Sequence, residues 1–136
     1  MLVKRVMRTP IMTVTPDTTV RAAAALMAER GLGVLPVCAN GRPIGIVTDR
    51  DIVTRWVSTA DADSNIGQIM TPEIVTCRAD QTVEQAAYLM SDNQIRRLVV
   101  VGNSGEIAGI ITLGDIANDA SEELAGQTLG EIVEER

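Results

Sequence analysis

The chain has 136 residues, a net charge of -6 at neutral pH and an apolar fraction of 46%. This length and composition are those of one ordinary globular domain with its own core, and they argue against a disordered chain. The acidic balance argues against binding to nucleic acid or to anionic membranes, because such proteins gather lysine and arginine against phosphates.

The first predicted elements are a strand over "IMTVT" (11–15) and a helix that begins at Thr18 or Thr19. β-Branched residues favour the strand, and threonine is a favourable N-cap for a helix with apolar residues at helical spacing. The same order returns later in the chain, where "EIVTC" (73–77) predicts a strand and Thr82 caps a helix.

These segments belong to an internal repeat. "TVRAAAALM" (19–27) and "TVEQAAYLM" (82–90) align residue by residue. After one inserted residue near Ser104, "GIVTDRD" (45–51) aligns with "GIITLGD" (109–115). Half of a chain of this size buries too little surface to be comfortably stable alone, so we expect the two copies to pack against each other about a pseudo-twofold axis.

Each helix leads into two strands joined by a tight turn, and a second helix follows. The strand pairs are predicted over 33–38 and 44–48 in the first copy, and over 97–101 and 107–112 in the second, with Asn and Gly in both turns. Gly31 is the predicted end of the first helix. Each copy thus reads strand, helix, strand, strand, helix, which is an α/β (α+β) fold class.

The predicted organisation is a first repeat over 7–57, a linker over 58–68, a second repeat over 69–119 and an acidic C-terminal tail over 120–136. The linker is polar, and the tail is partly amphipathic. Two glycines weaken a helix in the tail, so we expect its order to depend on a docking surface. The apolar stripe of the tail consists of Ala125, Leu129, Ile132 and Val133.

A threonine followed three residues later by an aspartate ends the last strand of each copy, at Thr48 and Asp51 and at Thr112 and Asp115. One interpretation is a capping box, in which the two residues satisfy each other's backbone amides at a helix start. Aspartate is a short reciprocal cap, however, and a helix start at the end of a sheet is also a natural anion site. The pattern therefore supports both a helix start and a binding site.

Histidine is absent, and the two cysteines, Cys38 and Cys77, are far apart in the sequence. Most zinc sites and most nucleophilic enzymes use histidine or closely spaced cysteines, so we expect no catalytic residue, no metal site and no required cofactor. Both cysteines are predicted to be reduced and buried. No run of about 20 apolar residues and no secretory signal is visible, so we expect a cytoplasmic protein that binds no membrane.

Two duplicated segments carry a family resemblance: "PDTTVRAAAALMAERGLGVLPVCANGRPIGIVTDRDIV" and "ADQTVEQAAYLMSDNQIRRLVVVGNSGEIAGIITLGDIA". They resemble a tandem pair of cystathionine-β-synthase (CBS) domains, the arrangement called a Bateman module. The resemblance implies two pseudo-twofold-related β-α-β-β-α repeats without catalytic activity. It also implies an adenosine ligand in the clefts between the repeats, such as AMP, ADP, ATP, S-adenosylmethionine or an NAD-type molecule.

Carried onto this sequence, the resemblance implies that Asp51 and Asp115 hold ribose hydroxyls while Thr48 and Thr112 hold phosphate. The chemistry agrees, because a carboxylate accepts two hydrogen bonds from a vicinal diol and a hydroxyl suits an anion. The resemblance places adenine against the first strand of each repeat, where core packing is the alternative role. The residues concerned are Met12, Thr13, Val14, Val75, Thr76 and Cys77.

The two copies differ in their cations. Arg50 lies inside the first turn, beside an aspartate, whereas the second turn has Leu113 and Gly114. Arg96 and Arg97 precede a strand of the second copy, and a solvated surface or a salt bridge is the alternative role of all three arginines. So few clustered cations favour AMP or ADP over ATP, and they predict two sites of unequal affinity.

The leading hypothesis is a regulatory module that binds an adenosine nucleotide and signals to an unknown regulated protein. The alternative is a ligand-free interaction or scaffold module. Exposed alanine-rich helices, at 22–25 and at Ala86 and Ala87, indicate close helix packing, and CBS pairs usually dimerise through such helices, so we expect a homodimer. Trp56 is predicted to make a packing or dimer contact rather than to stack on a base.

Overall fold

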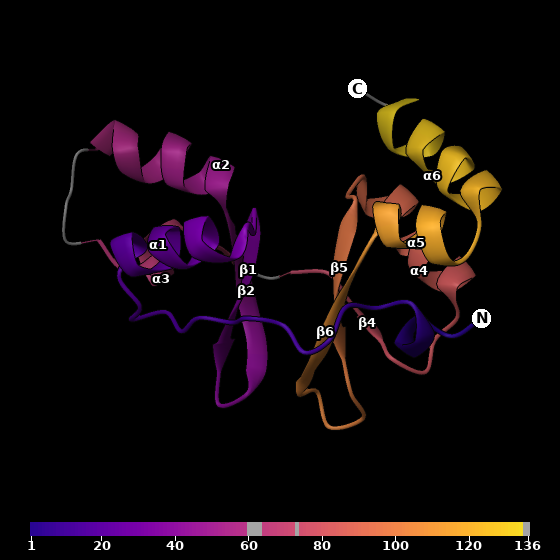
Figure 1. The fold of residues 1–136 in the computed structure, drawn as a ribbon, viewed down its shortest axis with the longest axis horizontal. Helices are drawn as coiled ribbons and strands as arrows, with labels where there is room; N and C mark the ends of the chain where they lie inside the picture. Colours follow the sequence, from indigo (N-terminus) through magenta and orange to yellow (C-terminus); the bar gives the residue numbers. More distant parts are fainter. Residues whose placement is uncertain (60–63, 73, 135–136) are drawn as a thin grey trace. The chain divides into compact units, whose positions relative to one another are not determined.

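Two three-stranded sheets, each with its helices on one face, carry the fold (Figure 1). The computed structural model describes residues 1–59, 64–72 and 74–134. These residues form two compact units. The first-repeat unit is Met12–Ile74, and the second-repeat unit combines Met1–Ile11 with Val75–Arg136. The predicted first repeat, 7–57, includes residues 7–11, and these residues belong to the second-repeat unit.

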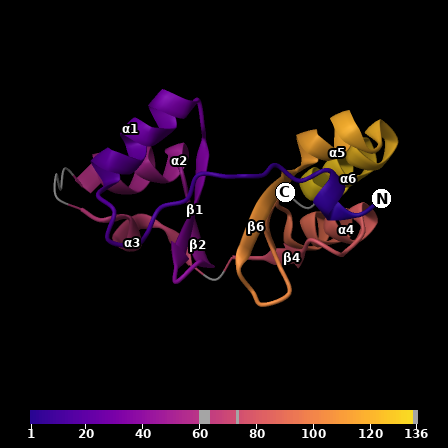
Figure 2. The same ribbon diagram turned by 60° about the horizontal axis from the view of Figure 1, so that its bottom comes forward.

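The first-repeat unit contains an antiparallel sheet in the order β1-β2-β3, with helices α1, α2 and α3 on one face (Figures 1 and 2). Its elements are α1 (Val20–Arg30), β1 (Val34–Ala39), β2 (Arg42–Thr48), α2 (Asp49–Asp51), the π-helix η2 (Ile52–Trp56), the 3-10 helix η3 (Val57–Thr59), α3 (Ile66–Ile69) and β3 (Thr71–Pro72).

The second-repeat unit contains a mixed sheet in the order β4-β5-β6, with helices α4, α5 and α6 on one face. Its elements are the 3-10 helix η1 (Val3–Arg5), β4 (Thr76–Arg78), α4 (Val83–Asn93), β5 (Arg97–Val101), β6 (Ile107–Thr112), α5 (Leu113–Asp119) and α6 (Glu122–Glu134). Both units show the predicted helix, hairpin and second helix. The predicted pseudo-twofold relation concerns the placement of the units and stays a prediction.

Local sequence signals explain the element ends. Thr19 caps α1 and Thr82 caps α4, and Gly31 ends α1 with a left-handed φ of 65°. The hairpin of the first copy turns at Asn40 and Gly41, whose φ values of 54° and 75° are those that such a turn requires. These predictions are confirmed.

The strand predicted over 11–15 is wrong, because only Val14 pairs, in one parallel bridge with Val37. The Val14 amide donates to the Pro36 carbonyl, and the Cys38 amide donates to the Val14 carbonyl. The next bond of a parallel ladder would run from the amide of residue 36 to the Met12 carbonyl, and proline has no amide hydrogen.

The second copy has Val99 where the first has Pro36, and there the strand forms. Strand β4 pairs in parallel with β5 from Thr76↔Val99 onward. The strand predicted over 73–77 is thus present at Thr76–Arg78, and Glu73 lies outside the described residues. The Ala79 amide also donates to the Val101 carbonyl, whereas the corresponding residue of the first copy is Pro16, so two prolines limit that segment to a single bridge.

The segments outside the predicted repeats are partly helical. The predicted linker contains η3 and the start of α3, and its residues 60–63 lie outside the described part of the chain. The predicted tail forms α6, which packs against α4 and α5. Ala125 and Ile132 of the apolar stripe are buried, whereas Leu129 and Val133 are 40% and 38% exposed. Its order comes from this packing.

Two predictions concerned residues at a helix contact, the alanines of the helices and Trp56, and they have different outcomes. Ala86 and Ala87 are buried in the core of their own unit, so the expectation that they form an exposed helix surface is wrong. Trp56 packs against the core of the first-repeat unit, as predicted, and the Arg21 guanidinium lies 5.6 Å from its ring centroid.

No helix within the described residues is long and apolar enough to cross a membrane.

Both cysteines are buried, Cys38 in β1 and Cys77 in β4, and neither forms a disulfide. Burial raises the pKa of the Cys77 thiol to about 11. Burial also raises the pKa of Cys38, and a hydrogen bond with the Thr13 side chain opposes part of that increase. Both thiols are therefore held in the neutral form.

In a Cys38→Ala variant, Cys77 is expected to react with an aromatic disulfide reagent at pH 8 about 100-fold more slowly in the native than in the urea-unfolded protein. The native thiol is then almost entirely protonated, whereas an unfolded thiol titrates near pH 8.5. Because the native pKa is raised, the contribution of Cys77 to stability is full below about pH 8.5 and is lost as the pH rises toward about 11. Equal rates in the two states would contradict a buried neutral thiol.

Candidate functional site

The Thr-x-x-Asp turns have the same geometry in both units. The Thr48 hydroxyl accepts from the Asp51 amide at 3.1 Å, and the Asp51 Oδ2 atom accepts from the Thr48 amide at 2.9 Å. The corresponding distances for Thr112 and Asp115 are 3.1 and 3.0 Å. Both turns are complete capping boxes. The capping interpretation is confirmed, and aspartate completes the box in both copies although it is a shorter reciprocal cap than glutamate.

The capping box uses one oxygen of each carboxylate, and Oδ1 remains. Asp115 Oδ1 accepts from Arg8 Nε at 2.9 Å. Asp51 Oδ1 lies 3.8 Å from Arg55 Nε, one helical turn further along the chain, which is beyond hydrogen-bond distance. The side chains of Asp115 and Asp51 are 7% and 15% exposed. The two aspartates thus make the same capping contacts but differ in how closely a cation approaches Oδ1.

Most amides at these helix starts already have partners. The Asp49 amide donates to the Gly33 carbonyl, and the Leu113 amide donates to the Arg96 carbonyl. The Arg50 amide donates to the carboxylate of Asp49 at 2.8 Å. In the second unit Leu113 occupies the position of Asp49, and its apolar side chain cannot accept from the Gly114 amide. Fewer free helix amides are therefore left to bind an anion than the sequence predicts.

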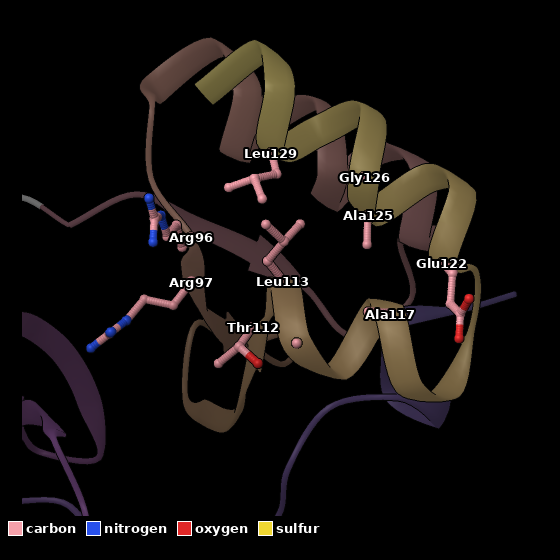
Figure 3. Close-up of a pocket in the computed structure, with 10 residues that line it drawn as sticks. Arg96, Arg97, Thr112, Leu113, Ala117, Glu122, Ala125, Gly126 and Leu129 are labelled. Carbon is pink, nitrogen blue, oxygen red and sulfur yellow. The ribbon is translucent and has the colours of Figure 1, made fainter. Parts of the chain in front are cut away.

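A pocket of about 470 Å³ opens beside the second turn (Figure 3). Arg96 and Arg97 lie at one end of it, and the side chains of Leu113 and Leu129 point toward each other between α5 and α6. Its volume is that of a small-molecule site. The complete lining consists of Arg96, Arg97, Thr112, Leu113, Gly114, Ala117, Glu122, Ala125, Gly126 and Leu129.

The pocket brings together only three of the predicted ligand-binding residues, namely Arg96, Arg97 and Thr112. Asp115 lies at the same turn but is buried behind it, with 5% of its surface exposed. In the first-repeat unit, Arg50 is exposed next to Asp51. The roles of all these side chains toward a ligand stay predictions.

The predicted adenine-contacting residues differ in exposure. Met12 and Thr13 are exposed and Val14 is buried, and in the second unit Val75 and Thr76 are half-buried. Cys77 is buried within the core, where it serves packing. Because Pro36 cannot donate to the Met12 carbonyl, the backbone at Met12 and Thr13 is the more accessible of the two segments.

Three features of the site were not predicted from the sequence, namely Arg8, Arg55 and the part of the pocket lining on α6. Arg8 is more than a hundred residues from Asp115, so no local spacing indicates their ion pair. Arg55 follows Asp51 by four residues, a helical spacing that by itself favours an ion pair, so the sequence does carry a signal for this contact. The part of the pocket lining on α6 depends on how that helix packs, which its sequence does not state.

The position of Arg8 depends on a close approach of residues 7–8 to β6. The Arg8 amide donates to the Ile110 carbonyl, and the Ile110 amide donates back to the Arg8 carbonyl. A Cβ atom on Gly109 would lie 2.7 Å from the Arg8 carbonyl oxygen and 2.9 Å from Met7 Sδ. Gly45 meets Met70 and Thr71 in the same way in the first-repeat unit.

The family profile described as "CBS domain" matches residues 3–58 and again residues 66–122. The CBS domain-containing protein YhcV of Bacillus subtilis is 38% identical over 132 residues, which are 96% of this chain and 94% of that protein.

Two solved structures of similar fold carry adenosine compounds. The CBS domain protein PAE2072 from Pyrobaculum aerophilum, complexed with AMP, has a TM-score of 0.81 and 25% identity, over 93% of this chain and 99% of that one. The CBS domain pair of protein MJ0100, in complex with 5'-methylthioadenosine and S-adenosyl-L-methionine, has a TM-score of 0.74 and 29% identity, over 86% of this chain and 97% of that one.

The variant Gly109→Ala is expected to lower the free energy of unfolding by about 1–3 kcal/mol, because its methyl group would overlap backbone that two hydrogen bonds hold in place. The matched control is Gly126→Ala on α6, where a Cβ atom meets nothing within 4 Å. That change is expected to raise stability by about 0.5–1 kcal/mol. Urea unfolding measures both, and equal effects would contradict the close approach at Gly109.

Proposed function

Because the chain belongs to the CBS domain family, with a match in each of its two repeats, we propose that it is a regulatory module that binds an adenosine nucleotide without catalysing a reaction. The observation that carries the proposal is the duplicated turn, in which a buried or half-buried carboxylate keeps one oxygen outside its capping box. A cap alone needs only the other oxygen.

Each polar group of the turn suits one part of such a ligand. The outer oxygen of Asp51 or Asp115 accepts from the ribose hydroxyls, which donate as a vicinal pair. The threonine hydroxyl accepts from the aspartate amide and still has its own hydrogen to donate to a phosphate oxygen. Thr48 and Thr112 are therefore proposed as phosphate contacts.

The cations of the second unit favour a short phosphate chain. Arg96 and Arg97 lie at the end of the pocket and can neutralise one or two phosphate groups, to which the Thr112 hydroxyl can donate a hydrogen bond. In the first-repeat unit the exposed Arg50 is offset by Asp49, whose carboxylate already holds the Arg50 amide. We therefore propose AMP or ADP as the ligand, ahead of ATP, S-adenosylmethionine and NAD-type molecules.

Adenine is proposed to lie against the backbone of Met12 and Thr13 and against the corresponding residues Val75 and Thr76. The Met12 carbonyl cannot receive a ladder bond from Pro36, so it can accept from an amino group of the base. Val14 and Cys77 are buried and would contribute shape rather than hydrogen bonds.

Binding of AMP is expected to be lost stepwise in Asp51→Ala and Asp115→Ala and abolished in the double variant. Calorimetry with AMP, ADP and ATP without magnesium measures it, and AMP or ADP is expected to bind more tightly than ATP. Each variant also loses a cap worth about 0.5–2 kcal/mol. The matched control is Gln85→Ala, which removes the reciprocal partner of the α4 capping box and leaves both predicted turns unchanged.

Unchanged binding in both aspartate variants would reduce the turns to helix caps. Tighter binding of ATP than of AMP would overturn the ligand ranking. No binding of any adenosine compound by the parent chain would favour the ligand-free interaction module instead.

The signal is proposed to pass through a homodimer to a separate regulated protein. Val53 and Val57 are 62% and 58% exposed and lie one helical turn apart, and such apolar surface is suited to a helix contact between two copies.

Sedimentation equilibrium is expected to give a dimer for the parent chain and a monomer for the double variant Val53→Ser, Val57→Ser, because the change removes apolar area only where it is exposed. Val133→Ser on α6, 38% exposed, is the matched control. A monomeric parent chain would contradict the proposal of a dimer.

A further inference from the structure

We propose that Arg8 competes with the ligand for Asp115, so that the site of the second repeat binds more weakly than the site of the first and fills after it. This inference rests on the proposed function, because it concerns the regulation of the same carboxylate. It assigns a specificity-determining role to a residue outside the Thr-x-x-Asp turn.

The ion pair occupies the oxygen that the proposed function needs. Asp115 Oδ2 accepts from the Thr112 amide at 3.0 Å, and Oδ1 accepts from Arg8 Nε at 2.9 Å. A charged donor forms a stronger hydrogen bond than a neutral hydroxyl does. Ribose hydroxyls that approach Asp115 must therefore displace Arg8 or share this oxygen with it.

The backbone of Arg8 is fixed while its side chain can move. Both backbone groups of Arg8 pair with Ile110, and residues before it pair with the same unit, since the Val3 amide donates to the Gln81 carbonyl and the Lys4 amide to the Ala79 carbonyl. The side chain of Arg8 is 65% exposed. The guanidinium can thus leave Asp115 without any change in the fold of the segment.

The first-repeat unit lacks this arrangement. Thr71 pairs with Ile46 where Arg8 pairs with Ile110, and a threonine has neither the charge nor the length of an arginine. The nearest cation to Asp51 among its described ion pairs is Arg55 Nε, at 3.8 Å. The outer oxygen of Asp51 is therefore open to a hydroxyl donor where that of Asp115 is occupied.

The test isolates the second site by working in an Asp51→Ala background and titrating AMP by calorimetry. Adding Arg8→Ala is expected to tighten AMP binding by about two- to fivefold, the upper part of the range of one exposed ion pair. The matched control is Arg78→Ala, which removes an equal charge and a similar ion pair, Arg78 Nε to Asp80 Oδ1 at 3.0 Å, from the same unit. It is expected to leave AMP binding unchanged.

A second measurement reports on Arg8 itself. Its Nε–H signal in a ¹H–¹⁵N spectrum, identified by its loss in Arg8→Lys, is expected to shift and to exchange faster with water when AMP is added. Thermal unfolding without ligand accompanies each variant, so that a change of affinity is separated from a change of stability.

The outcomes distinguish the two proposals. Binding of AMP by the parent chain, with unchanged or weaker binding after Arg8→Ala, overturns the role of Arg8 and leaves the proposed function intact. No binding in the Asp51→Ala background with or without Arg8, while the parent chain binds, also overturns it. Absence of binding by the parent chain and by every variant overturns the proposed function together with the inference.

Discussion

The pairing of residues 7–8 with β6 is the contact on which the second-repeat unit depends. It joins the first residues of the chain to a strand about a hundred residues later, through two hydrogen bonds between Arg8 and Ile110. Gly109 permits the approach because it carries no side chain. Together with the bonds of Val3 and Lys4 to Gln81 and Ala79, the pairing makes residues 1–11 part of the second unit, and it also delivers the Arg8 side chain to Asp115.

The closing turn of each repeat serves two purposes through the two oxygens of one carboxylate. One oxygen completes a capping box and fixes the start of the last helix. The other is directed to a cation, closely in the second unit and loosely in the first. A turn can therefore be required for folding and still present an acceptor to a ligand, so the two interpretations of the pattern are compatible.

Differences between the two copies arise from a few positions. Pro36 and Pro16, in place of Val99 and Ala79, prevent the first segment from pairing as a strand, because proline has no amide hydrogen. Thr71 against Arg8 decides whether a cation reaches the aspartate. In the first unit the Asp49 carboxylate accepts from the amide of the next residue, whereas Leu113, at the same position of the second unit, has no acceptor. A duplicated fold can thus hold two sites that are built alike and behave differently.

The amino-acid sequence by itself determined the repeat, the hairpins, the caps at Thr19 and Thr82 and both Thr-x-x-Asp turns, because each of these depends on residues that are near one another in the chain. The composition also indicated buried, reduced cysteines. The role of the tail as a packed helix was only partly visible, since its apolar stripe was clear and its packing surface was not.

Only the tertiary structure decided which segment joins which unit, which oxygen of Asp115 is occupied, and how α6 completes the pocket with Leu129. These features depend on contacts between residues far apart in the sequence. No local spacing, propensity or charge pattern encodes such a contact, because its geometry is set by the packing of whole elements. The sequence therefore defined the parts of the candidate site, and the fold decided how far each part is open to a ligand.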